Sequence, residues 1–448
     1  MYSGAHTTAF KRITAAVVIA LSVLCAQAGT RYISPQGSDA NDGLSPASPL
    51  LTADKALSLG ADVIVCEPGI YFQHINLRLT GKPIVTIRSA SASARAIFKA
   101  PECILLADGT ERPEGGKVFS FPIGDNVQIH DRNNRIYQEG IPDRNTLISP
   151  HERHSLQGDA SYRCRATIIH RCVATTLTQA MREIEASDSC KWFYDTANRR
   201  IYLSRPAQSS PAHAICYSRG ANLFSGAYSG TSVDISGIEA WYMAVNVSDM
   251  YQPMLTACAA RYVFSGGAFY WHNSTDATFI ECEAESAAYG NTGDGFNGHS
   301  TPGHRTSATL IRCWAHDNCD DGFSDHERCS STILGGLFEY NGKAGVTPAY
   351  GSHNYTSQAL SRRNFNGFYC VGTVEDPTDG PGSMTCTDCV SENNTRRPTP
   401  LFLFPAREAT GYGFAVDGTG NSATIIRCQS ISDRVPHHAT PGTSIKIQ

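Results

Sequence analysis

The chain has 448 residues, including 39 glycines; only 17% of its residues are charged, and its formal net charge is −4. It contains no basic run, so we expect neither nucleic acid nor an anionic membrane surface as its partner. This composition is typical of an all-β solenoid, which can form one long domain.

Residues 1–28 have the features of a secretory signal peptide. Lys11 and Arg12 give a positively charged start, an apolar stretch covers residues 13–24, and Ala26-Gln27-Ala28 fits a cleavage site. The apolar stretch is too short for a permanent transmembrane helix. We therefore expect a secreted, periplasmic or cell-surface protein with no transmembrane segment, and we expect it to be a monomer.

Residues 29–114 begin with RYISPQGSDANDG and continue to a Pro-Gly-Ile-Tyr motif at residues 68–71. This stretch resembles the N-terminal cap and first coils of many extracellular β-helix proteins that act on carbohydrates. We expect residues 53–59 to form a short helix that covers the open end of a solenoid, because terminal repeats need such a cap.

Residues 115–215 interrupt the coil period. They contain KWFYDTANRRIYLSRP, in which two strand-like runs flank Thr196-Ala197-Asn198. This pattern predicts a β-hairpin within an insertion. A second insertion, at about residues 372–410, is rich in proline and arginine, and we expect it to form a loop beside the functional face.

Residues 216–448 carry a repeat with a period in the low twenties, which is typical of a stacked solenoid. A small residue with apolar and polar neighbours in period-two alternation recurs in register at Gly237, Cys258, Cys282, Cys313, Gly336, Ala359, Cys389 and Cys428. An asparagine follows it by five residues at Asn318, Asn341, Asn364 and Asn394. These columns predict a right-handed parallel β-helix, in which the cysteines point inward as compact hydrophobic groups.

Two segments of this β-helix share the pattern Asp-Gly-Phe-x-x-His, at residues 294–299 and 321–326. If both phenylalanines point inward, strand alternation turns Asn297, Ser324, His299 and His326 outward, and stacking brings the two histidines together. The same outward columns continue through Thr347 and Tyr369, and an aromatic run that includes Trp271 precedes them. Such a strip suits a bound sugar chain. The alternative is that these polar residues only cap turns and hydrogen-bond along the stack.

Carboxylates gather beside this strip. Asp294 and Asp321 precede glycine in successive coils, and Asp320 adjoins them. Three carboxylates so close together repel one another unless a cation relieves them, and Ca²⁺ prefers such oxygen ligands. An aspartate ladder without a metal is the alternative.

The two motifs resemble those of family-9 polysaccharide lyases, whose motif has the form ADGF…K…N.DDGFD. The resemblance implies that Asp294, Asp320 and Asp321 bind calcium. This chain differs at Ser324, where that family has another calcium-binding Asp, and at the later catalytic lysine, where Thr347 or Tyr369 stands.

The same stretch resembles the YGFDPHE strand of mannuronan C5-epimerases, which Gly322, Phe323, His326 and Glu327 match. This resemblance implies that His326 transfers a proton. Asp321 stands where that family has its tyrosine, and Ser324 where it has its aspartate.

Both resemblances imply removal of the proton α to a uronate carboxylate, which needs a base and a cation near the carboxylate. His326 is the expected base, and His299 is its partner or binds substrate. Ca²⁺, Lys343, Arg362 or Arg363 would supply the positive charge. We therefore expect a lyase that cleaves an acidic polysaccharide by β-elimination, with C5-epimerisation of the same substrate as an alternative.

Two other classes remain open. A β-helix glycoside hydrolase would use two carboxylates, and Asp320, Asp321, Asp325 and Glu327 offer several pairs. A non-catalytic carbohydrate-binding solenoid is favoured by the absence of the lyase lysine and by the serine at position 324.

Overall fold

The computed structural model describes residues 29–100, 112–115, 117–122, 135–139, 166–187, 191–204, 215–216, 221–226, 230–287, 293–372, 380–394 and 411–448. The predicted signal peptide and most of the second predicted insertion lie outside these residues. No helix in the described part of the chain is long and apolar enough to span a membrane.

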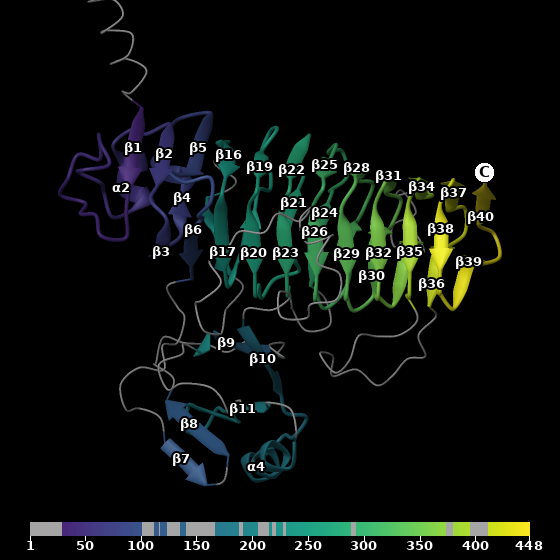
Figure 1. The fold of residues 1–448 in the computed structure, drawn as a ribbon, viewed down its shortest axis with the longest axis horizontal. Coiled ribbons are helices and arrows are strands. Elements are labelled where there is room, and N and C mark those ends of the chain that lie inside the picture. Colours follow the sequence, from purple (N-terminus) through teal and green to yellow (C-terminus); the bar gives the residue numbers. More distant parts are fainter. Residues whose placement is uncertain are drawn as a thin grey trace, which may run out of the picture.

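Three long parallel sheets run side by side along the molecule (Figure 1). Each full coil contributes one strand to each sheet in turn, as β25, β26 and β27 do for residues 307–325. The predicted right-handed parallel β-helix is therefore confirmed.

The twelve-stranded sheet consists of β1 (Thr30–Ile33), β2 (Val63–Cys66), β5 (Ile84–Ser89), β16 (Ser232–Ser236), β19 (Met254–Thr256), β22 (Ala277–Ile280), β25 (Ser307–Ile311), β28 (Ser330–Leu334), β31 (His353–Ser357), β34 (Ser383–Thr387), β37 (Ser422–Ile426) and β40 (Ser444–Ile447). The ten-stranded sheet consists of β3 (Gly69–Phe72), β6 (Ala96–Lys99), β17 (Ile238–Trp241), β20 (Ala259–Arg261), β23 (Glu283–Glu285), β26 (Trp314–His316), β29 (Leu337–Glu339), β32 (Leu360–Arg362), β35 (Val390–Glu392) and β38 (Gln429–Ile431). The nine-stranded sheet consists of β14 (Ala221–Asn222), β18 (Met243–Asn246), β21 (Gly267–His272), β24 (Asp294–His299), β27 (Phe323–Asp325), β30 (Ala344–Pro348), β33 (Asn366–Cys370), β36 (Tyr412–Val416) and β39 (Val435–Ala439).

The N-terminal end carries the predicted capping helix, α2 (Ala53–Ser58) (Figure 1). The hydroxyl of Thr52 accepts a hydrogen bond from the backbone N–H of Lys55 at 3.1 Å, and Ala53, Ala56 and Leu57 are buried in the solenoid core. A short pair of β4 (Ile75–Asn76) with β15 (Phe224–Ser225) and the 3₁₀ helix η1 (Leu77–Leu79) complete this end. The cap buries the apolar end of the stack.

The insertion forms a separate seven-stranded sheet below the N-terminal half of the solenoid in Figure 1. Its strands are β7 (Arg112–Gly115), β8 (Val118–Pro122), β9 (Arg135–Glu139), β10 (Ala166–Arg171), β11 (Lys191–Asp195), β12 (Arg200–Ser204) and β13 (Ile215–Cys216). The predicted hairpin is present, because β11 and β12 pair antiparallel with Trp192 opposite Leu203. The amphipathic helix α4 (Leu177–Ala186), which buries Ala180 and Ile184, was not predicted.

Stacked side chains fill the solenoid core. Phe269 and Phe296 stack with ring centroids 4.9 Å apart, and Phe368 and Phe414 do so at 5.0 Å. The cysteines of the predicted small-residue column take inward positions, and Cys282 donates its S–H to the carbonyl of Leu255 in the previous coil. In these positions the thiols act as compact hydrophobic groups, as expected.

The predicted asparagine column forms a buried ladder that explains the Asp-Gly-Phe motifs. The side-chain oxygen of Asn341 accepts a hydrogen bond from the amide side chain of Asn318 at 2.9 Å. In the following coils the side-chain oxygens of Asn364 and Asn394 accept the backbone N–H of the preceding asparagine, at 2.8 and 2.9 Å. A Cβ atom on Gly295 would lie 2.8 Å from the Asn318 amide nitrogen, and one on Gly322 would lie 2.7 Å from that of Asn341. Glycine is therefore required there by the close approach of the ladder.

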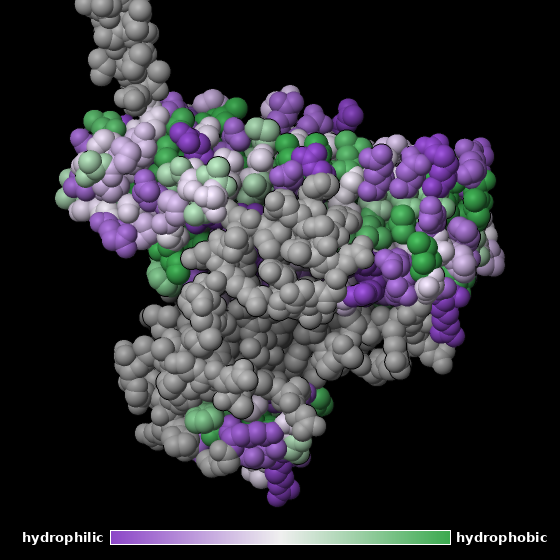
Figure 2. All heavy atoms as spheres, in the orientation of Figure 1, coloured by the Kyte–Doolittle hydropathy of each residue, from purple (hydrophilic) through white to green (hydrophobic). Residues whose placement is uncertain are grey.

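Hydrophilic and hydrophobic residues are interspersed over the part of the solenoid surface that Figure 2 draws in colour. This face of the described chain therefore presents no single extended apolar patch in that view.

Candidate functional site

The outer face of the nine-stranded sheet carries the two predicted polar columns. Asn297, Ser324 and Thr347 lie in register in β24, β27 and β30. His299 pairs with His272 of the preceding strand, and the backbone N–H of His326 bonds to Gly298 in the coil before it. Strand alternation places these residues opposite the inward phenylalanines, as the sequence predicted. We call this face the histidine strip.

The two histidines of the strip are stacked. The rings of His299 and His326 lie 4.5 Å apart and nearly parallel, at 6°. The Nδ1 atom of His299 lies 2.7 Å from Glu327 Oε2, and His326 Nε2 lies 2.8 Å from Ser324 Oγ. Burial, with help from His299 and Lys343, holds the pKa of His326 well below its usual range. His326 is therefore an uncharged imidazole at neutral pH, which is the form that a general base needs.

Two polar atoms beside Ser324 have no partner among the described residues. They are Asn297 Oδ1 and Thr347 Oγ1, and both side chains are buried. A buried polar group without a hydrogen bond is costly, so such atoms are suited to bonding a ligand that supplies the missing partner.

The predicted acidic cluster is also formed. Ligand atoms of Asp294, Asp320 and Asp321 lie within 4.8 Å of one another. The ammonium of Lys343 lies 3.2 Å from Asp321 Oδ2 and 3.6 Å from Asp320 Oδ1. Burial raises the pKa of Asp294 well above its usual value, and Asp320 and Asp321 raise it further. The carboxylates outweigh the opposing effect of burial on Lys343 and raise its pKa.

Protein donors already occupy much of this cluster. Asp294 Oδ1 accepts the backbone N–H of Asp321 at 2.9 Å, its Oδ2 accepts the amide of Asn297, and Asp321 Oδ1 accepts the N–H of Ala344 at 2.8 Å. With Lys343 beside the remaining oxygens, the cluster has a built-in cation. These bonds fit an aspartate ladder neutralised by lysine better than a calcium cage, which needs six to eight oxygen ligands.

Of the remaining predicted residues, Trp271, Arg362 and Arg363 lie away from the histidine strip, and Tyr369 lies in its outward column. Trp271 is wrong as a sugar contact, because it points inward, is fully buried, and packs 5.2 Å from Phe279. Its neighbours Tyr270 and His272 take the outward positions. Arg363 lies on a turn and bonds to the hydroxyl of Tyr340, and no described contact joins it to the histidines. Tyr369 lies in the outward column and donates its hydroxyl to Asp417 at 3.2 Å. Arg362 pairs with Glu339 at 2.9 Å on the ten-stranded sheet.

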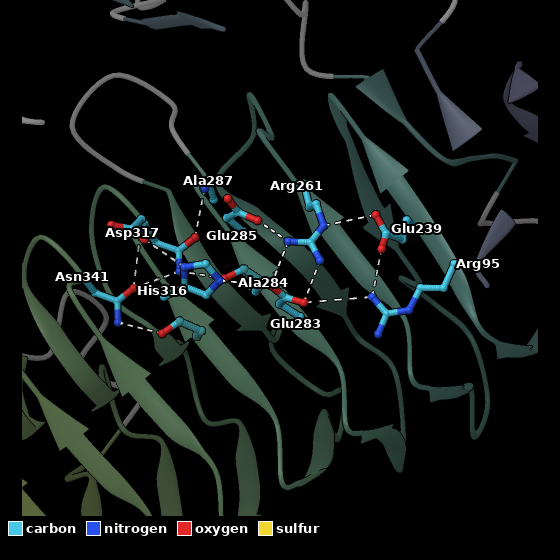
Figure 3. A network of polar contacts seen from close by, with 12 residues as sticks. Arg95, Glu239, Arg261, Glu283, Ala284, Glu285, Ala287, His316, Asp317 and Asn341 are labelled. Atoms are coloured by element: carbon cyan, nitrogen blue, oxygen red, sulfur yellow. Dashed lines mark hydrogen bonds and ion pairs between the residues drawn. The ribbon is translucent and has the colours of Figure 1, made fainter. Parts of the chain in front are cut away.

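A second polar cluster, which the sequence analysis missed, covers the outer face of the ten-stranded sheet (Figure 3). Arg261 lies at its centre, with Glu239 on one side and Glu283 and Glu285 on the other. Its guanidinium holds Glu283 through two bonds of 2.8 and 2.7 Å, reaches Glu239 at 3.2 Å, and also bonds Glu285. We call this cluster, with Arg95, His316 and Asp317, the arginine–glutamate network.

The network is buried and internally neutralised. Arg95 bonds Glu239 at 3.1 Å, while His316 lies 2.8 Å from Asp317 and 3.3 Å from Glu283. Burial opposes protonation of His316, but its bonds to Asp317 and Glu283 outweigh burial and raise its pKa to about 9. A protonated His316 thus adds positive charge to a cluster rich in carboxylates.

The charges continue along the stack in alternating sign. One outward column of the ten-stranded sheet runs, in successive coils, through Arg261, Glu285, His316, Glu339, Arg362 and Glu392. His316 and Arg362 therefore each have a negative residue in the coils before and after them, at the coil spacing of about 4.8 Å, while Arg261 at the start of the column follows Trp241.

The sequence did carry a signal for this network. In the aligned segments around Cys258, Cys282 and Cys313, the residues one and three places after the small residue must face outward. Those places hold Arg261, Glu283 and Glu285, and charged residues at outward positions of a sheet in successive repeats indicate a paired surface.

Comparison with known proteins supports the fold. No protein-family model matches the chain, and no curated protein matches it in sequence. The structure of XylC in complex with xylose matches 90% of this chain and 69% of that chain, with a TM-score of 0.50 and 10% identity. A glycoside hydrolase matches 92% of this chain and 97% of its own, with a TM-score of 0.46 and 10% identity. A GH136 lacto-N-biosidase from Eubacterium ramulus matches 94% and 68%, with a TM-score of 0.25 and 9% identity. The likeness to XylC identifies the chain as a protein of parallel β-helix fold.

Proposed function

We propose that this protein is a carbohydrate-active enzyme that cleaves a glycan bound to the histidine strip. The observation that carries the proposal is the stacked pair His299 and His326 beside the unpartnered polar atoms of Asn297 and Thr347. Sugars are rich in hydroxyl groups that donate and accept hydrogen bonds, so they can satisfy such atoms. The expected signal peptide supports an exported location, and the resemblance of the Asp-Gly-Phe motifs to those of uronate-acting enzymes supports an acidic polysaccharide as substrate; both are part of the proposal.

For an acidic glycan, the strip supports proton abstraction. An uncharged His326 would take the proton α to the uronate carboxylate, while the Lys343 ammonium would face the carboxylate and stabilise the charge that develops. Loss of the 4-linked sugar then gives an unsaturated product, as in a lyase, and reprotonation from the other face gives an epimerised sugar.

Glycoside hydrolysis is the second candidate, and the likeness in fold favours it. The XylC structure contains xylose, and the reaction requires two carboxylates, one acidic and one ionised. Glu327 and Asp320 are the partly exposed carboxylates of the histidine strip and its acidic cluster, with side chains 33% and 20% exposed. They would take these roles on a neutral glycan, in which no proton α to a carboxylate is available.

The role of calcium is a separate question. If Asp294, Asp320 and Asp321 bind Ca²⁺, excess chelator should lower activity or the melting temperature, and Asp321→Asn should remove that effect. If Lys343 is the cation, activity should be unaffected by chelator and should fall in Lys343→Met.

One assay separates the reactions. The protein is incubated with a panel of neutral and uronate-containing polysaccharides, and ultraviolet absorbance is followed alongside reducing ends. A rise in ultraviolet absorbance together with new reducing ends identifies a lyase, and new reducing ends alone identify a hydrolase. Proton exchange into the sugar without new reducing ends identifies an epimerase. If no polysaccharide in the panel is altered while several are bound, the protein is a binding module and the proposal is wrong.

A further inference from the structure

We propose that Ser324 and His326 also form a nucleophile–base pair for acyl transfer, which removes small ester-linked acyl groups from glycan hydroxyls. The pair is defined by the contact of 2.8 Å between Ser324 Oγ and His326 Nε2. This is the distance over which an imidazole activates a serine hydroxyl as a nucleophile. The reaction differs from glycan cleavage, although it would use the same imidazole.

The arrangement of the strand brings these groups together. Ser324 lies in β27 and His326 follows two residues later, so both side chains face outward from the nine-stranded sheet. His326 stacks on His299 at 4.5 Å and contacts the ring of Tyr350, which is tilted by 36° at 5.5 Å, and these two contacts restrict the plane of the imidazole. Since its pKa is held low, the imidazole is ready to accept the serine proton at neutral pH.

The neighbouring coils supply groups of the right kind on both sides of the serine. Thr347 lies in register with Ser324 in the next coil, and its hydroxyl, which has no partner among the described residues, can donate to an oxyanion. Asn297 lies in register in the coil before, and its unpartnered Oδ1 can accept a hydrogen bond from a sugar hydroxyl. An acyl carbon above Ser324 would thus have a donor for its oxygen on one side and a contact for its sugar on the other.

The burial of Ser324 limits the acyl group. Its side chain is fully buried, whereas that of His326 is partly exposed. The space for an acyl group at the hydroxyl is therefore confined. This favours a short chain such as acetyl over an aromatic or fatty acyl group.

The reaction needs no co-reactant other than water. Ser324 Oγ attacks the acyl carbon and gives its proton to His326 Nε2, and the carbonyl oxygen becomes an oxyanion beside the Thr347 hydroxyl. The sugar oxygen leaves with the proton from His326, and the acyl group stays on Ser324. His326 then deprotonates a water molecule, which attacks the acyl-serine, releases the carboxylic acid and restores the hydroxyl.

A covalent probe tests the pair directly. The full-length protein is treated with methanesulfonyl fluoride, whose small sulfonyl group fits the size limit set by the burial of Ser324, and the modified peptide is identified by mass spectrometry, while 4-nitrophenyl acetate reports turnover by release of 4-nitrophenol. We expect the adduct on Ser324. Ser324→Ala should lose the adduct, His326→Ala should slow its formation at least about 100-fold, and Thr347→Val should slow acetate release about 100-fold.

Ser330→Ala is the matched control, because Ser330 is exposed in β28 on the twelve-stranded sheet, away from the strip. It should label and turn over as the parent does. The proposal is overturned if the folded parent gives no adduct on Ser324, or if His326→Ala reacts at the parental rate. Labelling requires no glycan, so a labelled Ser324 in a protein that cleaves no polysaccharide would refute the proposed function and leave this pair standing.

Discussion

The outer faces of the nine-stranded and ten-stranded sheets are built in the same way, but their polar side chains differ in charge and in pairing. On both, strand alternation and coil stacking arrange polar side chains into columns. On the ten-stranded sheet, Arg261 bonds three glutamates and the charges alternate along the stack. On the nine-stranded sheet, an uncharged His326 lies beside two polar atoms that have no described partner.

This difference separates a structural polar surface from a reactive one. A buried charge contributes to a stable fold only when partners compensate it, as they do around Arg261. Groups left without partners cost stability, and folds retain them where a ligand or a reaction uses them. The histidine strip is therefore the better candidate for function, although the network has more ionisable groups.

Disrupting the arginine–glutamate network should have the largest effect, and that effect should be on the stability of the fold. Arg261→Met leaves Glu239, Glu283 and Glu285 buried without their central cation, and we expect the free energy of unfolding to fall by about 3–5 kcal/mol. Urea denaturation at pH 7 measures the change. Arg427→Met is the matched control, because Arg427 pairs with Asp388 while its side chain stays 65% exposed, and it should unfold as the parent does. Equal stabilities for the two variants would show that the network is not structural.

Removing the base of the histidine strip should affect activity and spare the fold. We expect His326→Ala to lose at least about 100-fold in glycan turnover, since general bases contribute about 10²- to 10⁴-fold. The assay of absorbance and reducing ends measures it. His353→Ala, at an exposed position in β31, should keep parental turnover. Parental turnover in a folded His326→Ala would place the chemistry on other residues.

The third test uses the proton on His316. Because the folded state raises the pKa of His316 to about 9, its bonds stabilise the protein fully below about pH 6.5. That contribution is lost as pH rises through 9, and we expect it to be on the order of 2 kcal/mol. Denaturation of the parent and of His316→Gln at pH 6, 7.5 and 9 should show the gap between them closing as pH rises. A constant gap would mean that His316 is uncharged in the folded protein.

The smallest effect concerns Asp325, which lies on the inner side of the histidine strand. Its carboxyl is fully buried, and burial raises its pKa to about 7, while the Ser331 hydroxyl acts in the opposite direction. The folded state thus favours the uncharged acid, so ionisation costs stability as pH rises from about 4 through 7. Asp325→Asn should be more stable than the parent by on the order of 1 kcal/mol at pH 8 and unchanged at pH 4. The opposite order would indicate a buried cationic partner.

Much of this architecture could be predicted because it repeats. The small-residue and asparagine columns fix the stacking register, and register with strand alternation is enough to place His299 beside His326. The same rule, applied strictly, would have put Trp271 inside, because it alternates with the outward Tyr270 and His272. The error came from treating the whole aromatic run as a surface feature, without following which of its residues alternate outward and inward.

Other features could not be predicted from the sequence of a single coil, because their residues come together from several coils. The arginine–glutamate network connects Arg95, which precedes β6, with His316, which lies four coils further along the solenoid. The residues of the inserted sheet lie between these two in the sequence. The helix α4 did leave a local signal, since Thr176 caps it through the N–H of Gln179 at 3.4 Å. The position of Lys343 against two aspartates depends on side-chain conformation, which spacing alone does not determine.

The alternating column from Arg261 to Glu392 also restricts how the chain can change in length during evolution. Loss of the single coil that carries His316 would bring Glu285 against Glu339, and loss of the coil with Glu339 would bring His316 against Arg362. Removing two adjacent coils keeps opposite charges in contact. Within this stretch, duplications and deletions that add or remove two coils should therefore be retained more often than those of one coil. The evolutionary repeat is then two coils, although the structural repeat is one coil.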